Sequence, residues 1–245
     1  MHTESENTGK LNKRTITSAV IILIFIPSTI LFGVFFLDDR KYFIVSLMII
    51  CYAMIPFFLV FERRKPQARE MIIIAVLIAI AVAGRAAFFM VPQFKPVIAI
   101  VIITAVCFGA EAGFLTGAMA GFVSNFFFGQ GPWTPWQMFC FGIIGFLAGV
   151  LSQKGFLKRS RKQLCFFGGL TTFLIYGGIV DLWTIFMVTP EPEMETAIIV
   201  YGTALWFNII HSSATVIFLY ILANPMIEKL ERIKVKYGLI EKLPK

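Results

Sequence analysis

Residues 75–136 read AVLIAIAVAGRAAFFMVPQFKPVIAIVIITAVCFGAEAGFLTGAMAGFVSNFFFGQGPWTPW, and this stretch decides the fold. Alanine recurs every four residues from Ala75 to Ala87, and glycine does the same from Gly109 to Gly121. Small residues four apart lie close together along one side of a helix and let another backbone approach. The stretch therefore predicts two smooth helical faces, followed from Gly129 to Trp136 by a rigid aromatic turn.

The composition indicates a membrane protein. Of the 245 residues, 58% are hydrophobic and 15% are charged, and the mean hydropathy is +0.82. Soluble domains carry about 25% charged residues. We expect an all-α, multi-pass protein of the cell (plasma) membrane, because the apolar runs suit helices and not the alternating strands of a barrel. The net charge of +8 does not indicate nucleic-acid binding, because the basic residues flank apolar runs and orient helices there.

Eight apolar runs are predicted to cross the membrane. They lie at residues 16–37, 42–61, 71–90, 96–108, 112–128, 136–152, 164–188 and 197–222. The run at 96–108 would span only about 20 Å as a helix, less than a hydrocarbon core of about 30 Å. It is therefore either a short helix or the first part of a re-entrant segment.

Positive charge favours eight crossings. If every run crosses, the basic groups at residues 10–14, 63–69, 154–162 and 229–245 share one side, and they hold 18 of the 22 Lys and Arg residues. The opposite side has three, and Arg85 lies within a span. Cytoplasmic loops of membrane proteins are rich in Lys and Arg. Both termini are therefore predicted to be cytoplasmic, with the connections at 38–41, 91–95, 129–135 and 189–196 outside.

Four segments follow from this topology. Residues 1–15 form a cytoplasmic tail, and residues 16–70 form an additional N-terminal transmembrane hairpin. Residues 71–224 form a core of six helices. Residues 225–245 form a basic amphipathic tail, which we expect on the inner membrane surface beside anionic lipids. A helix that docks on a partner protein is the alternative for this tail.

Polar side chains within the core cluster near its outer end. Arg85, Asn125 and Asp181 lie there, and Tyr201 begins the last span. Ionisable residues inside a membrane usually face the bundle interior or a water-filled cavity. Arg85 and Asp181 have opposite charges at similar depth, so one interpretation is a structural ion pair. The other is a polar patch that lines an outward-facing cavity.

The aromatic segment also has two interpretations. Tryptophan commonly anchors helices at the membrane interface. However, two Trp bracketed by Pro132 and Pro135, after two glycines, suit a rigid loop above a cavity for a ligand with a large apolar face. The predicted ligand-binding residues are Arg85, Phe88, Asn125, Gln130, Trp133, Trp136, Asp181, Trp183 and Tyr201.

Several kinds of chemistry have no motif in the sequence. There is no Walker A sequence, HExxH or GxSxG. The four cysteines have no CxxC spacing, and His2 and His211 stand apart, so we expect no metal and no cofactor. The spans lack the repeated carboxylates of a proton-coupled pump. The sequence therefore indicates a binding or transport protein and not an enzyme.

From about residue 71 to 223 the chain resembles the substrate-binding S component of an energy-coupling factor (ECF) transporter. The features behind this resemblance are the alanine ladder from Ala75 to Ala83, the turn PQFKP at 92–96, the glycine ladder, Ser124-Asn125 and GQGPWTPWQM at 129–138. The last of these is similar to the subgroup associated with cobalamin uptake. The family core has six helices, so the hairpin at 16–70 is a departure.

The resemblance implies a division of labour. The S component binds cobalamin or a related vitamin or micronutrient, while a separate transmembrane coupling protein and two cytosolic ATPase subunits supply energy. In this family the S component is thought to topple in the membrane to carry its ligand inward. The face at Ala75, Ala79 and Ala83 would dock on the coupling protein.

Three alternatives remain at this stage. A stand-alone secondary transporter or facilitator would keep working after loss of ATPase partners. An intramembrane enzyme could use Arg85, Asp181 and His211, but His211 is predicted to lie deeper than the other two. A structural or assembly membrane protein would show no ligand-dependent stabilisation.

Overall fold

The computed structural model of the chain describes residues 13–36, 42–62, 68–188 and 193–237. These residues form helices and no strand. The helices are α1 (Lys13–Val20), the π-helical η1 (Ile21–Phe25), α2 (Ile26–Phe36), α3 (Tyr42–Glu62), α4 (Ala68–Ala87), α5 (Val97–Phe108), α6 (Ala110–Phe128), α7 (Trp133–Gln153), α8 (Arg161–Thr171), the π-helical η2 (Thr172–Gly177), α9 (Gly178–Val188) and α10 (Met194–Lys236).

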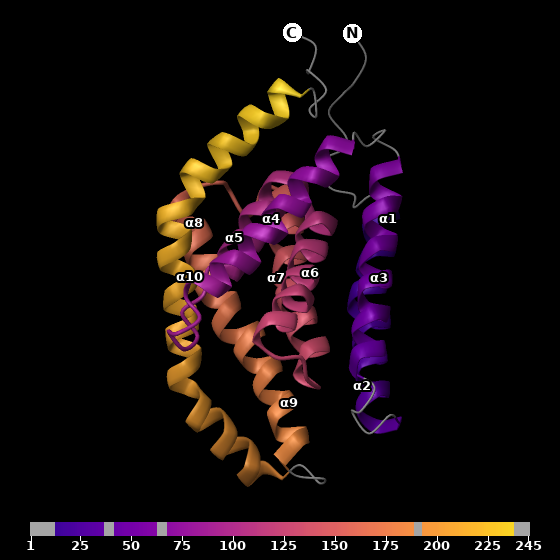
Figure 1. The fold of residues 1–245 in the computed structure, drawn as a ribbon, viewed down its shortest axis with the longest axis vertical. Coiled ribbons are helices and arrows are strands. Elements are labelled where there is room, and N and C mark those ends of the chain that lie inside the picture. The colour runs from indigo at the N-terminus through magenta and orange to yellow at the C-terminus, as the bar shows by residue number, and fades with distance from the viewer. Residues whose placement is uncertain (1–12, 37–41, 63–67, 189–192, 238–245) are drawn as a thin grey trace.

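The all-α membrane architecture is confirmed. Five helices among the described residues are long and apolar enough to cross a membrane, namely Ile16–Phe36, Arg69–Ala87, Trp133–Gln153, Arg161–Met187 and Met194–Lys236. The start of α1 and the end of α10 lie at the same end of the molecule (Figure 1). An even number of crossings would produce this arrangement, but eight crossings and cytoplasmic termini stay predictions.

The short run at 96–108 forms the buried centre of the core. All twelve residues of α5 are buried, and α4, α6, α7 and α10 surround it. The helix ends at Gly109, whose φ of +103° is a conformation that glycine adopts without strain. The chain then enters α6 at once. The run thus forms a short helix, and whether this helix crosses the membrane or belongs to a re-entrant segment stays a prediction.

The glycine ladder of α6 packs against a second set of glycines on α7. A Cβ on Gly117 would lie 2.4 Å from the backbone carbonyl of Phe141, and a Cβ on Gly145 would lie 2.5 Å from the carbonyl oxygen of Gly113. Bare glycine backbones let two helices approach closely. The close packing that results is the main attraction between helices in lipid. The smooth face predicted from the glycine spacing is therefore an interface within the molecule.

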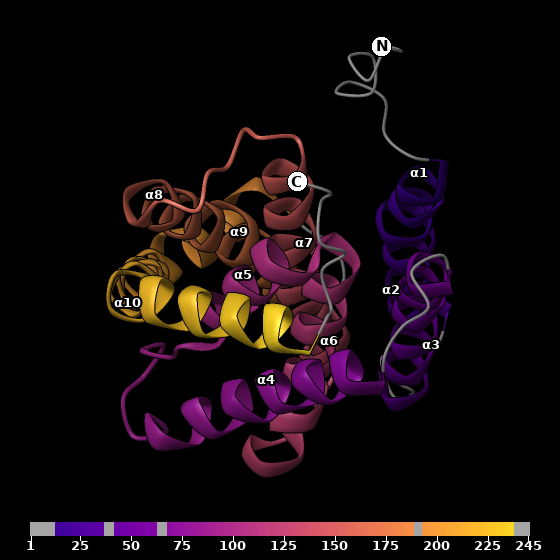
Figure 2. The same ribbon diagram turned by 90° about the horizontal axis from the view of Figure 1, so that it is seen from above.

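The N-terminal helices form a hairpin on the flank of α6 and α7. α1, η1 and α2 follow one another as one continuous helix that lies beside α3 (Figure 2), and α3 contacts both α6 and α7. A separate hydrophobic cluster fills this junction, with Ile26 and Ile49 of the hairpin fully buried. Phe43 also packs on Phe122 of α6, with ring centroids 5.8 Å apart. The hairpin thus has an apolar interface with the core.

The basic amphipathic tail predicted from residue 225 begins inside a longer helix. α10 runs without a break from Met194 to Lys236 and passes through Pro225. Ile227 and Leu230 join the main hydrophobic core. The extension therefore packs against the bundle, although Lys229 remains exposed.

Polar contacts attach this extension to the end of α5. Lys234 donates to the carbonyl oxygen of Cys107 at 2.6 Å, and Arg159 donates to that of Val106 at 2.9 Å. Both cations also form ion pairs with Glu231. Cations favour the carbonyl end of a helix, where the macrodipole is negative. These contacts attach the described part of the tail to the end of α5, and its position at the inner membrane surface stays a prediction.

The connection predicted at 129–135 is shorter than expected. α7 already begins at Trp133, so only residues 129–132 connect it to α6. Pro135 lies in the first helical turn, where a missing N–H leaves no helical hydrogen bond unmade. Trp133 and Trp136 are therefore held by a helix and not by a loop.

Candidate functional site

Arg85 is the centre of a polar group between three helices. It lies in the last turn of α4, and its Nη1 atom donates to Ser124 Oγ at 2.5 Å and Asn125 Oδ1 at 2.8 Å on α6. The same nitrogen lies 3.3 Å from Gln137 Oε1 on α7. The Arg85 guanidinium carbon lies 5.4 Å from the centre of the Phe128 ring. Arg85 is half-buried, while both α6 partners are buried.

The polar group continues into the π-helical segment η2. Gln137 donates from Nε2 to the Tyr176 hydroxyl at 2.8 Å. The Tyr176 ring stacks on Phe141 at 5.1 Å and meets the buried His211 edge-on at 4.5 Å. π-helical turns inside helices frequently mark functional positions. Through Tyr176, the polar group reaches from α4 to α10.

A hydrogen-bonded turn fixes the connection between α6 and α7. Asn125 donates from Nδ2 to Thr134 Oγ1 at 3.0 Å, and the Gly131 N–H donates to the same hydroxyl at 3.2 Å. Gln130 donates from Nε2 to the carbonyl oxygen of Phe122 at 3.1 Å. Asn125 therefore positions both the Arg85 guanidinium and the start of α7.

Trp133 and Trp183 form an aromatic pair between α7 and α9. Their ring centroids are 5.9 Å apart in an edge-on arrangement, and Trp133 is 36% exposed. The Trp183 Nε1 and Gln130 Oε1 atoms are buried and have no hydrogen-bond partner among the described residues. Buried polar atoms normally have partners. These two atoms are therefore open to hydrogen bonding with a ligand or water.

Asp181 and Tyr201 lie in a second polar group, on α9 and α10. Asp181 accepts from Asn208 Nδ2 at 2.7 Å, and the Tyr201 hydroxyl donates to the carbonyl oxygen of Gly178 at 2.8 Å. No ion pair joins Arg85 to Asp181 in the part of the chain that the structure describes. The structural ion pair considered from the sequence is therefore wrong, and the two charges belong to different networks.

Phe88 and Lys95 organise the turn after α4. Phe88 packs edge-on against Phe94 and against Phe218 of α10, at 5.6 and 5.1 Å. The Lys95 ammonium donates to the carbonyl oxygens of Phe88 and Val91, the latter at 2.7 Å. Partial burial, together with the nearby positive charge of Arg85, lowers the pKa of Lys95. Phe88 thus faces the junction with α10.

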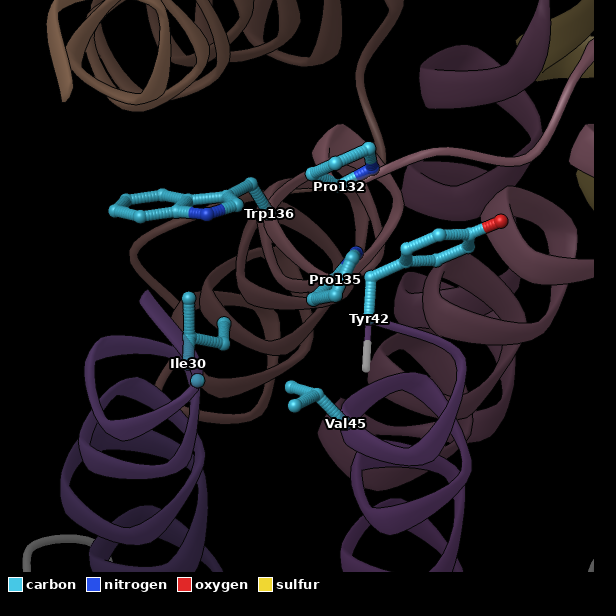
Figure 3. Close-up of a pocket in the computed structure, with 7 residues that line it drawn as sticks. Ile30, Tyr42, Val45, Pro132, Pro135 and Trp136 are labelled. Carbon is cyan, nitrogen blue, oxygen red and sulfur yellow. The ribbon is translucent and has the colours of Figure 1, made fainter. Parts of the chain in front are cut away.

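Trp136 lies in the junction with the N-terminal hairpin. It is 6% exposed and packs near Phe186, with ring centroids 6.3 Å apart. Figure 3 shows it beside Pro132 and Pro135, across a cavity from Ile30, Tyr42 and Val45. This cavity measures about 10 Å³, room for roughly one water molecule. Ligand pockets measure about 300–1,000 Å³, so this cavity is not a vitamin site.

The predicted site residues therefore separate into distinct neighbourhoods. Arg85 and Asn125 share the polar group, Trp133 meets Trp183, and Asp181 lies with Asn208. Four residues whose roles were not predicted from the sequence complete these networks, namely Gln137, Tyr176, Thr134 and Asn208. The available signal for Gln137 and Asn208 was that each is a polar residue within an otherwise apolar run.

The alanine face of α4 points away from the bundle. Ala75, Ala79 and Ala83 are all exposed, whereas Leu77 and Ala81 on the opposite side are buried. Other apolar side chains surround this face, with Ile72 61% and Val76 51% exposed. The face thus has no partner within the described chain.

Comparison with known proteins finds one matching family model and one relative among the curated proteins. The family model described as "ECF-type riboflavin transporter, S component" matches residues 65–230. A UPF0397 protein of Vibrio atlanticus (strain LGP32) is 28% identical over 121 residues, which cover 46% of this chain and 66% of that protein. The alignment therefore spans just under two thirds of the Vibrio protein's length. No solved structure matches the chain.

Proposed function

Because the chain belongs to the family of ECF-type riboflavin transporter S components, we propose that it is the high-affinity substrate-binding membrane subunit of an ECF-type importer for a vitamin. Partner subunits, a transmembrane coupling protein and two cytosolic ATPases, supply the ATP hydrolysis. The observation that carries this proposal is the family match over residues 65–230, which extends from the start of α4 almost to the end of α10. This family consists of transporter subunits and not of enzymes.

We propose that the importer takes up an aromatic, planar vitamin. The paired rings of Trp133 and Trp183 offer walls for such a molecule, and the unpartnered atoms of Gln130 and Trp183 offer it one acceptor and one donor. The family description favours a flavin. Cobalamin, expected from the GQGPWTPWQM stretch, has no support from the comparisons. We therefore place the flavins first, tested with riboflavin, and keep cobalamin as the competitor in the experiment.

We further propose that Ala75, Ala79 and Ala83 form the docking face for the coupling protein. The support is that these three side chains are exposed on α4 while the opposite side of the helix is buried. Helices associate in lipid mainly by close packing, which small residues permit. The N-terminal hairpin contacts α6 and α7 and leaves this face of α4 open.

The test is ligand binding by the purified full-length protein. Riboflavin and cobalamin are titrated separately, and binding is followed by calorimetry and by quenching of tryptophan fluorescence. We expect saturable binding of one vitamin, and vitamin uptake by cells that requires the coupling protein and both ATPases. Uptake that persists without the ATPases would contradict the proposal and favour a stand-alone facilitator. An absence of any vitamin-dependent stabilisation would favour a structural protein.

A further inference from the structure

The positive charge of Arg85 has no anionic partner in the described structure. Its three acceptors, a serine hydroxyl and two side-chain amides, are neutral. The ion pairs recorded among the described residues both involve Glu231, which lies near the end of α5. Arg85 instead lies at the beginning of α5, because the neighbouring Gly84 packs against Pro96. The two regions are one helix length apart.

An unpaired cation is expensive in this environment. Removing a charged group from water is costly unless it gains both a counter-charge and hydrogen bonds. Ser124, Asn125 and Gln137 orient the guanidinium but do not neutralise it. Ionisable residues within membrane helices usually mark substrate or ion pathways. A bound anion would therefore supply the counter-charge that the guanidinium lacks.

The negative ends of helix dipoles offset this charge only in part, because Arg85 lies in the last turn of α4 but a helix end carries only about half a unit charge. Lys95 already meets the C-terminal end of α4, because its ammonium donates to the carbonyl oxygens of Phe88, Phe89 and Val91. Arg85 donates to side chains and to no backbone carbonyl. Lys95 thus acts as a helix cap, whereas Arg85 has no such role.

The geometry of Arg85 leaves one edge of its guanidinium for a ligand. All three recorded hydrogen bonds use Nη1, and none is recorded for Nε or Nη2 with the residues that the structure describes. Guanidinium groups bind carboxylates and phosphates through two parallel N–H donors. Arg85 is also half-buried and not sealed. Its free edge therefore suits a bidentate contact.

We propose that the ligand of this S component carries an anionic group, a carboxylate or a phosphate, which the free edge of Arg85 binds. This inference rests on the proposed function and specifies its substrate class. Riboflavin itself is neutral, so the inference selects a phosphorylated or acidic vitamin. The aromatic pair of Trp133 and Trp183 would then hold the ring system, and Arg85 the charge.

The experiment compares two flavins that differ by one phosphate. Riboflavin and riboflavin 5′-phosphate are titrated into the purified full-length protein, the Arg85→Gln variant and the Arg69→Gln variant. Arg69 is the matched control, because it lies in the first turns of the same helix and is exposed. We expect the phosphate ester to bind the parent protein at least about tenfold more tightly, since hydrogen bonds to charged groups are strong. Arg85→Gln should abolish this preference, and Arg69→Gln should preserve it.

Three results would overturn the inference. Riboflavin could bind the parent as tightly as its phosphate, or the preference could survive in Arg85→Gln. If neither flavin binds, inorganic phosphate and acetate are titrated, and the absence of any Arg85-dependent stabilisation by them overturns it as well. Should Arg85→Gln not fold, the comparison in the parent protein decides. Tight binding and ATPase-dependent uptake of a neutral vitamin would refute the inference while leaving the proposed function intact.

Discussion

Substituting Gly117 by alanine tests the packing on which the whole core depends. The new Cβ would lie 2.4 Å from the carbonyl carbon and oxygen of Phe141 and 2.6 Å from the nitrogen of Gly142. These are backbone atoms, so no side-chain rotation relieves the clash. Non-bonded heavy atoms prefer about 3.5–4.0 Å, so α6 and α7 would have to separate by about 1 Å. That movement would also loosen the contact between Gly113 and Gly145.

The clash should outweigh the gain in helix propensity. Alanine favours a helix over glycine by about 1 kcal/mol. Overpacking costs about 1–3 kcal/mol, and we expect the upper end here because backbone has to move. A net loss of about 2 kcal/mol lowers the unfolding temperature of a chain this size by roughly 4–8 °C. Unfolding is followed by tryptophan fluorescence of the purified protein during heating.

Gly202→Ala is the matched control. It makes the same substitution in a helix, and a Cβ there would meet nothing within 4 Å. We expect its unfolding temperature to equal or slightly exceed that of the parent. If Gly117→Ala unfolds at the same temperature as Gly202→Ala, the close approach of α6 and α7 is refuted.

Three further predictions concern topology, docking and binding. From outside the cell, an impermeant thiol reagent should label a cysteine placed at the exposed Val91 and not one placed at the exposed Lys158; the reverse pattern would refute the topology. Ala79→Leu should preserve vitamin binding but reduce co-purification of the coupling protein, because leucine prevents close helix approach; undiminished recovery would count against docking there. Trp133→Ala should weaken vitamin binding at least tenfold, since the proposed ligand would bury this exposed ring and truncating an aromatic contact at an interface costs a few kcal/mol; unchanged affinity would exclude the ring from the site.

Much of the fold could be predicted because it depends on local pattern. Long apolar runs dictate membrane helices, since unpaired backbone groups are costly in lipid. Gly109 separates α5 from α6 because its backbone conformation suits glycine. The four-residue spacing of glycine from 109 to 121 indicated a close helix contact, and α7 provides it. These features need no knowledge of which helices are neighbours.

The partners of the polar residues could not be predicted in this way. Sequence depth placed Arg85 and Asp181 together, yet Arg85 bonds to Ser124 and Asn125 while Asp181 bonds to Asn208. The position of a residue along its span indicates only its depth in the membrane. The rotation of each helix about its axis, its tilt and its neighbours decide which side chains meet within 3 Å. Several rotations bury similar apolar surface, so periodicity does not choose among them.

The end of α10 illustrates the same division. By itself the sequence determined an amphipathic helix after Pro225 with basic residues on it. Only the tertiary structure decided that Ile227 and Leu230 enter the core and that Lys234 bonds to the carbonyl oxygen of Cys107 near the end of α5. An amphipathic pattern specifies that one face of the helix is buried. The rest of the fold decides which surface buries it. Here the main hydrophobic core covers the apolar side chains, and the carbonyl end of α5 accepts a hydrogen bond from Lys234.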